Sequence, residues 1–154
     1  MHGSMSPKPC TDLTQRPPRS PRVRLGGYVI LPRMLDKCRA VVAGTNGEYD
    51  YGCSRDKSFL EFAGVDADAL KAEVAKGLGD GDILVWIRAN GKNARSESEI
   101  AAWSAYQERR VPENLASRDR FNAYHRASGA HRDDIGTWFD VLDLDDHVSF
   151  GGLS

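Results

Sequence analysis

The sequence predicts an all-α fold, a compact single domain of about six helices with an extended N-terminal arm rich in arginine and proline. Apolar residues recur at helical spacing in several separate segments. Glycines and prolines separate those segments. The segment 83–90 carries a continuous apolar run that suits either a buried strand or a buried helix. No other segment offers a convincing strand to pair with it, so we expect a helix that ends at Gly91.

Length and composition restrict the class of protein. A chain of 154 residues with 40% apolar and 28% charged residues suits one globular domain. No apolar run approaches the roughly 18 residues of a membrane span, and the first apolar segment is too short for a signal peptide. The three cysteines lack paired spacing, which is typical of a reducing compartment. We therefore expect a cytoplasmic protein with no membrane partner.

The arm comprises residues 1–22, of which residues 1–4 are interpreted as an expression remnant, and the helical domain comprises residues 23–154. Four arginines follow one another closely in and just after the arm: Arg16, Arg19, Arg22 and Arg24. Prolines lie between them and no acid does. Proline fixes φ and disfavours helix in the preceding residue, so the guanidinium groups are carried on an extended, stiff segment.

The first helix is expected to follow the arm and to end at Gly44. Its apolar residues fall on one face: Leu31, Met34, Leu35, Cys38, Val41 and Val42. Its charged residues lie largely on the other side: Arg33, Asp36, Lys37 and Arg39. Pro32 either opens this helix in its first turn or kinks a longer helix that reaches back to Val23. Residues 46–53 form either a small hairpin or an ordered loop.

Capping signals place the next two helices. Ser54 or Asp56 can cap a short helix that carries Phe59 and ends at Gly64. Asp66 is a good N-cap for the helix after it, which buries Leu70, Val74 and Leu78.

Three further segments complete the expected bundle. Ser96 and Glu99 fit a capping box that opens one helix. Residues 117–128 read as another helix, with Phe121, Tyr124 and Ala127 facing inward. Asp133 or Asp134 is expected to cap a short last helix, and residues 143–154 are expected to be loosely held.

Charge is distributed unevenly along the chain. Residues 1–40 hold eight bases and two acids, a net charge of +6. Residues 133–154 hold six acids and no base, a net charge of −6, while the whole chain carries −1. Such asymmetry bears on partners rather than on fold. Either the basic head and the acidic tail pair with each other, within one chain or across a dimer, or the head binds an external anion.

The same segments carry a family resemblance. The runs Asp12-Leu13-Thr14, 16–22 and Leu25-Gly26-Gly27-Tyr28, together with 33–37 and 59–62, resemble a bacterial domain-of-unknown-function family, number 5069. The similarity covers most of the chain from Asp12 onward. It implies a compact bacterial cytosolic domain, and it implies no substrate, cofactor or catalytic residue.

The candidate ligand-binding residues are the cations around the arm with one tyrosine: Arg16, Arg19, Arg22, Arg24, Tyr28, Arg33 and Lys37. Guanidinium is a rigid fork of donors that suits carboxylates and phosphates. The favoured function is therefore a helical module that binds an anionic small molecule or an acidic protein surface. The structural alternative is that the arm packs on its own domain and its arginines pair with the domain's acids.

Two other function classes remain open. In a small enzyme acting on an anionic metabolite, the arginines would orient the substrate and one nearby group would supply the chemistry: Tyr28, Tyr49, Cys53 or His125. In a structural dimer, the arm of one protomer would lie on the acidic tail of the other. Nucleic acid is disfavoured because the net charge is −1. No cofactor motif is present, and the acids near His147 do not follow an EF-hand pattern, so neither cofactor nor metal is expected.

Overall fold

The computed structural model describes residues 12–129 and 134–152, and the expected expression remnant lies outside them. The described residues contain helices and no strand; a single isolated bridge joins Leu25 to Tyr28. The helices are α1 (Leu31–Ala43), α2 (Ser54–Ala63), α3 (Ala67–Val74), α4 (Asp80–Asn90), α5 (Glu97–Glu108), α6 (Leu115–Gly129) and α7 (Trp138–Ser149). The all-α prediction is confirmed, with seven helices among the described residues in place of about six.

Helix α1 is the centre of the molecule. Pro32 lies in its first turn, so the longer kinked helix reaching back to Val23 is wrong. Gly44 ends the helix in the left-handed conformation that glycine adopts most easily. Every residue from Leu31 to Ala40 is buried, including the four charged ones expected on the opposite side.

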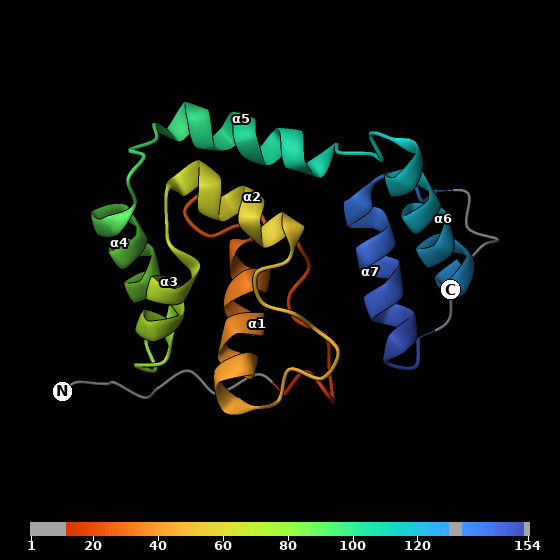
Figure 1. The fold of residues 1–154 in the computed structure, drawn as a ribbon, viewed down its shortest axis with the longest axis horizontal. Helices are drawn as coiled ribbons and strands as arrows, with labels where there is room; N and C mark the ends of the chain where they lie inside the picture. The colour runs from red at the N-terminus through yellow and green to blue at the C-terminus, as the bar shows by residue number, and fades with distance from the viewer. Residues whose placement is uncertain (1–11, 130–133, 153–154) are drawn as a thin grey trace.

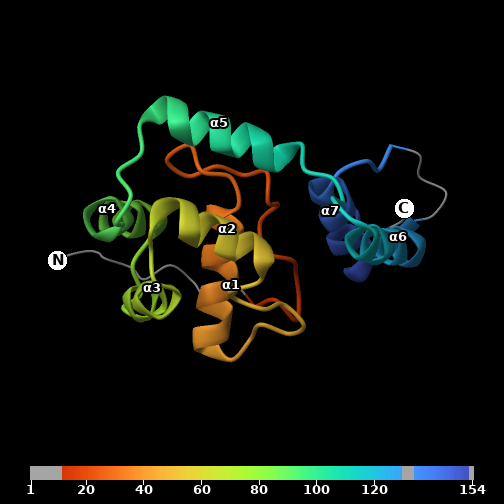
Figure 2. The ribbon, with the colours of Figure 1, turned by 45° about the horizontal axis from the view of Figure 1, so that its top comes forward.

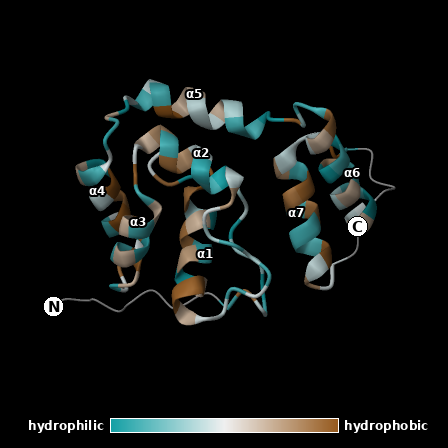
Figure 3. Ribbon diagram, viewed as in Figure 1, coloured by the Kyte–Doolittle hydropathy of each residue, from teal (hydrophilic) through white to brown (hydrophobic). Residues whose placement is uncertain are grey.

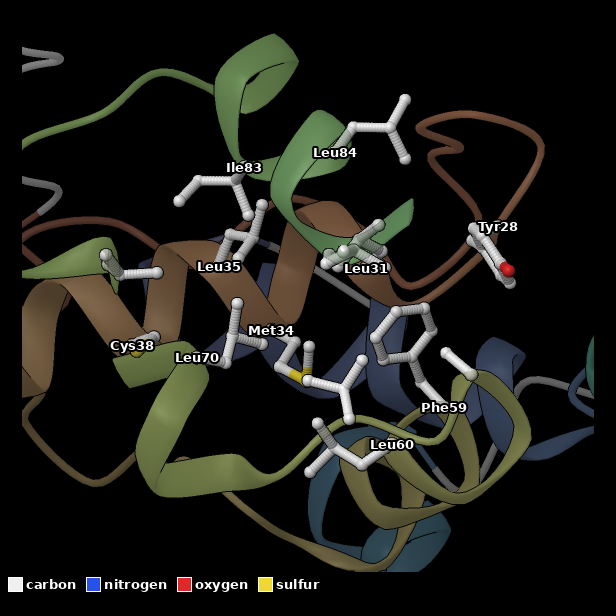
Figure 4. Packing of buried hydrophobic residues seen from close by; sticks show 14 of the residues in the cluster. Tyr28, Leu31, Met34, Leu35, Cys38, Phe59, Leu60, Leu70, Ile83 and Leu84 are labelled. Carbon is white, nitrogen blue, oxygen red and sulfur yellow. The ribbon is translucent and has the colours of Figure 1, made fainter. Parts of the chain in front are cut away.

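The main core surrounds α1. In Figure 4, side chains of α1 such as Leu31 and Met34 point toward Phe59 of α2, Leu70 of α3 and Ile83 of α4. Tyr28, which precedes α1, completes the cluster with its ring centre 5.0 Å from that of Phe59. In Figure 3 the hydrophobic residues of these helices alternate with hydrophilic ones along each helix, as expected of amphipathic helices.

The helices form two groups joined by the arm. Figure 1 shows α2, α3 and α4 around α1, with α5 lying across α2, while α6 and α7 stand side by side on the opposite flank. The arm, red to orange, runs between α1 and α7 in both views (Figure 1, Figure 2). Leu13 anchors it, because its side chain is buried and its N–H donates to the carbonyl oxygen of Thr45 at 2.9 Å.

Several local predictions are confirmed. Residues 83–90 lie within helix α4. Asp66 caps α3 by accepting a hydrogen bond from the N–H of Ala69, and Ser96 with Glu99 forms the capping box of α5. Residues 46–53 contain turns and no hairpin. None of the helices in the described part of the chain is long and apolar enough to span a membrane.

Other local predictions are wrong, mostly toward the C-terminus. Thr137, not Asp134, caps α7, and Asp133 lies outside the described residues. The acidic stretch after residue 143 continues α7 to Ser149 instead of being loose. Cys53 takes the cap position of α2 in place of Ser54 or Asp56. Tyr124 and Ala127 are exposed, whereas Phe121, Ser128 and Gly129 of α6 are buried.

Candidate functional site

The arm arginines point at carboxylates of the same chain. The guanidinium of Arg19 donates to Asp36 at 2.9 Å and to Asp80 at 2.7 Å. Arg22 pairs with Asp140, and its Nε lies 3.0 Å from an oxygen of Asp143. The pairing predicted between the basic head and the acidic tail is thus present within one chain.

The remaining predicted residues are dispersed. Arg24 pairs with Glu108 of α5 at 2.8 Å, and Arg16 is exposed. Tyr28 is 5% exposed and packs among aromatic rings of the core. Arg33 and Lys37 line one cavity on the side of α1 that faces α7, and Arg33 also donates to the carbonyl oxygen of Arg19 at 3.3 Å. That the predicted set binds an external anion stays a prediction.

Arg33 and Lys37 also have carboxylate partners, and both pairs are buried. Arg33 Nη1 lies 2.7 Å from Asp146 of α7. Burial would lower the pKa of Arg33, but the hydrogen bond from its guanidinium to Asp146 outweighs burial and raises that pKa. Lys37 Nζ lies 2.9 Å from Asp56 and 3.3 Å from Cys53 Sγ.

Two adjoining cavities separate α1 and α2 from the α6–α7 pair. The first, of about 710 Å³, lies between the arm, the 47–50 loop and α7. The second, of about 520 Å³, lies between the N-terminal half of α2, the end of α5 and α6. Cys53, Arg55 and Tyr124 line both cavities, so they mark the place where the two meet.

Three guanidinium groups line the second cavity: Arg55 of α2, Arg110 after α5 and Arg120 of α6. No carboxylate is among the described residues that line it. Its other polar lining consists of neutral groups, Ser54, Ser58, Gln107 and Ser117. The N-terminus of α2 also lies at this wall, and its cap residue Cys53 makes no side-chain capping bond. Each of these features favours an anion.

The three arginines are incompletely paired. Within the described part of the chain, Arg55 has no ion pair, and its guanidinium carbon stands 4.9 Å from the ring centre of Trp138. Arg110 donates to Glu113 at 3.2 Å, but its Nε is buried without a partner. Arg120 donates to the hydroxyl of Ser117 at 3.3 Å.

Burial lowers the pKa of Arg55, and the positive charges of Arg33 and Arg110 act in the same direction. A negative charge bound beside Arg55 would therefore stabilise its guanidinium and offset the neighbouring positive charges. Sequence reasoning missed this site because the three arginines come from three elements that share no motif. The only local signal was that Arg55 lies beside Cys53 in a loop that begins a helix.

The wall of the first cavity contains one strained residue. Ile30 has a φ of 75°, which a β-branched residue rarely adopts, and its side chain is buried. Its N–H donates to the carbonyl oxygen of Pro21 at 2.9 Å, so the arm holds this conformation. Strain of this kind is often kept at functional sites.

The family to which the chain belongs has no described function. The model of the family described as "Domain of unknown function (DUF5069)" matches residues 15–148, and the chain belongs to that family. The matched region contains every residue that lines the second cavity. It also contains the lining of the first cavity, except for the residues that precede residue 15 or follow residue 148. No curated protein matches the sequence. Among the described residues, no group of three or more His, Cys, Asp or Glu side chains is arranged to hold a metal ion.

Proposed function

We propose that the protein binds a small anionic molecule, a phosphate or carboxylate compound, in the second cavity. The observation that carries the proposal is a cavity wall with three guanidinium groups and no carboxylate among its described residues. Guanidinium donates two parallel hydrogen bonds to either anion. Arg33 and Lys37, two of the predicted ligand residues, line the first cavity instead, together with acids that include Asp56 and Asp145.

In this proposal the arm arginines act indirectly. Arg19 holds the arm to α1 and to the start of α4, and Arg22 holds it to α7. The arm therefore keeps α7 at the distance from α1 that leaves the first cavity open. A reducing bacterial cytoplasm fits this proposal, because both Cys38 and Cys53 are free thiols. Acidic protein surfaces and a second copy of the chain stay predictions as partners.

Titration with inorganic phosphate, followed by calorimetry at low ionic strength, tests the proposal. We expect binding to the wild-type chain and a loss of affinity of about tenfold or more for Arg55→Gln, because a hydrogen bond to a charged group contributes about 1.5–3 kcal/mol. Arg24→Gln is the matched control, since Arg24 is an exposed arginine paired with Glu108 away from both cavities.

Stability separates a lost ligand contact from a damaged fold. Among the described residues Arg55 has no carboxylate partner to leave behind, so Arg55→Gln is expected to lower the melting temperature in buffer without anions only by the small contribution of its contact with the Trp138 ring. If Arg24→Gln weakened phosphate binding as much as Arg55→Gln, or if the wild-type chain bound no phosphate, citrate or pyrophosphate, the second cavity would not be the anion site.

A further inference from the structure

We propose that Cys53 is a nucleophile that forms a covalent bond with a small electrophilic anion held in the second cavity. The charge of this substrate class rests on the proposed function. The nucleophile itself rests on a separate set of contacts around the thiol.

Cys53, Lys37 and Asp56 form a hydrogen-bonded series. Lys37 Nζ donates to Cys53 Sγ at 3.3 Å and lies 2.9 Å from Asp56 Oδ2. The Asp56 side chain is 1% exposed, and it also accepts a hydrogen bond from the N–H of Gly52 at 2.9 Å. A nucleophile in contact with a charged partner, which a third group holds in place, is the general arrangement of covalent catalysis.

Positive groups lie beside the thiol of Cys53. The ammonium of Lys37 is adjacent, and Cys53 occupies the cap position of α2, where the helix presents unpaired N–H groups. Cys38 provides a contrast inside the same chain. It is fully buried in the main core, and burial raises its pKa to about 11.

The location of Cys53 connects the thiol to the proposed anion site. Cys53 lines both cavities, as does Arg55 two residues further along α2. An anion held by Arg55 and Arg110 would therefore lie in a cavity whose wall also contains Cys53. Lys37 acts through the thiol and is a positioning residue, and Asp56 positions Lys37.

The covalent step is a displacement. The thiol first releases its proton to solvent. The Sγ thiolate then attacks the electrophilic carbon, an S–C bond forms, and the bond from that carbon to its leaving group breaks. The leaving group departs with the electron pair of that bond. No oxidant or reductant is consumed.

Alkylation of the full chain by iodoacetate and by neutral iodoacetamide tests the proposal, with the modified cysteines located by mass spectrometry. In both reactions iodide is the leaving group. We expect Cys53 to react faster than Cys38, and its ratio of iodoacetate rate to iodoacetamide rate to exceed that of the urea-unfolded chain by about tenfold, because the cavity concentrates the anionic reagent. Inorganic phosphate should slow the reaction with iodoacetate at Cys53.

Two variants divide the roles. Arg55→Gln should lower the rate with iodoacetate more than the rate with iodoacetamide. Lys37→Gln should lower both rates about tenfold, and Lys37→Arg, which keeps a cation beside the thiol, should restore part of the loss. Arg24→Gln is again the control and should leave both rates unchanged, since it lies outside the cavities.

The outcomes separate this inference from the proposed function. If Cys53 of the wild-type chain reacted with iodoacetamide no faster than in the unfolded chain, the nucleophile would be ruled out even where phosphate binds. If Cys53 reacted rapidly with iodoacetamide but showed no preference for iodoacetate and no protection by phosphate, the anionic substrate class would be wrong and the proposed function with it.

Discussion

At the residue scale, Asp146 is the carboxylate that ties the last helix to the first. It pairs with Arg33 at 2.7 Å and accepts a hydrogen bond from the hydroxyl of Tyr49 at 2.7 Å. The side chains of Asp146 and Arg33 are both 8% exposed. Asp146→Asn would leave the buried guanidinium without its counter-charge, so we expect a loss of about 3 kcal/mol in the free energy of unfolding. Urea unfolding at neutral pH measures it.

Arg24→Gln serves as the comparison for Asp146→Asn, because the Arg24 and Glu108 side chains are 42% and 31% exposed. Exposed ion pairs contribute about 0–1 kcal/mol, so this variant should unfold close to the wild-type midpoint. Equal losses for the two variants would contradict the assignment of the larger contribution to burial.

Ile30 offers a second test at this scale, because glycine normally destabilises a chain more than alanine does. At a φ of 75° the order should reverse, since alanine carries the Cβ that crowds the backbone and glycine does not. Both variants lose the buried side chain. We expect Ile30→Gly to be more stable than Ile30→Ala by about 1 kcal/mol in urea unfolding. An alanine variant as stable as the glycine variant would show that Ile30 is not strained.

The charged residues of α1 show how far single positions can be predicted. Asp36 lies three residues from Arg33 and three from Arg39, a spacing that allows either pair on a helix, and the structure has Arg39 at 3.7 Å from Asp36. The spacing could not predict that Arg39 also reaches Asp80 at 2.9 Å, or that the charged side of α1 is buried. Helical periodicity describes one helix in isolation. The charged side of α1 is buried by other parts of the chain, namely the arm, α4 and α7.

At the scale of elements, caps were predictable where one candidate stood alone. Asp66 and Ser96 each precede a single apolar pattern, and both cap as predicted. Before α7 two residues, Asp133 and Asp134, were predicted as caps, and the sequence offered no means of ranking them against Thr137. Helix α7 begins at Trp138 and buries Phe139, Val141 and Leu144, so Thr137 is the residue at its cap position.

Thr137→Ala tests the contribution of this cap. The side chain of Thr137 accepts a hydrogen bond from the N–H of Asp140, whose carboxylate accepts one from the N–H of Thr137 in return. Loss of such a cap costs about 1 kcal/mol, and we expect that loss in urea unfolding. Thr137→Ser keeps the hydroxyl and should stay within a few tenths of a kcal/mol of the wild type. A serine variant as unstable as the alanine variant would attribute the loss to the missing methyl group instead.

The candidate site belongs to the level of element packing as well, which explains why the sequence predicted residues of the adjoining first cavity and not those of the second. Arg33 and Lys37 stand one helical turn apart, so their common side of α1 was predictable. Arg55, Arg110 and Arg120 meet only because α5 carries the chain across α2 and returns it through α6, as Figure 1 shows. The spacing of these residues in the sequence does not predict that they lie together, because it describes neighbours within one helix and not the packing of different helices.

At the scale of the whole molecule, the uneven charge along the chain serves to assemble the two helix groups. The arm contributes Arg19 and Arg22, α1 contributes Arg33, and their partners lie on α1, α4 and α7. Protonation of these carboxylates should therefore lower the free energy of unfolding of the whole chain. Two of these carboxyl groups show the effect in their pKa values.

Burial would raise the pKa of Asp80, but the hydrogen bonds from Arg19 and Arg39 outweigh burial and lower that pKa below its ordinary value of 3.8. Burial likewise opposes the lowered pKa of Asp140, which the N–H groups of Gly136 and Thr137 bring about, with Arg22 adding to it. Both carboxyl groups thus bind protons more weakly in the folded chain than in the unfolded chain. The stability they contribute is complete well above the ordinary value and is lost as the pH falls through the lowered values.

We therefore expect the free energy of unfolding to change little on account of these groups between about pH 5 and 8 and to fall steadily below about pH 4. Urea unfolding at a series of pH values measures this dependence. In Asp80→Asn one of the two groups no longer titrates, so the variant should be less stable at neutral pH and should lose less on acidification than the wild type does. A wild-type chain as stable at pH 3 as at pH 6, or an unchanged acid loss in Asp80→Asn, would mean that the ion pairs of the arm do not hold the two helix groups together.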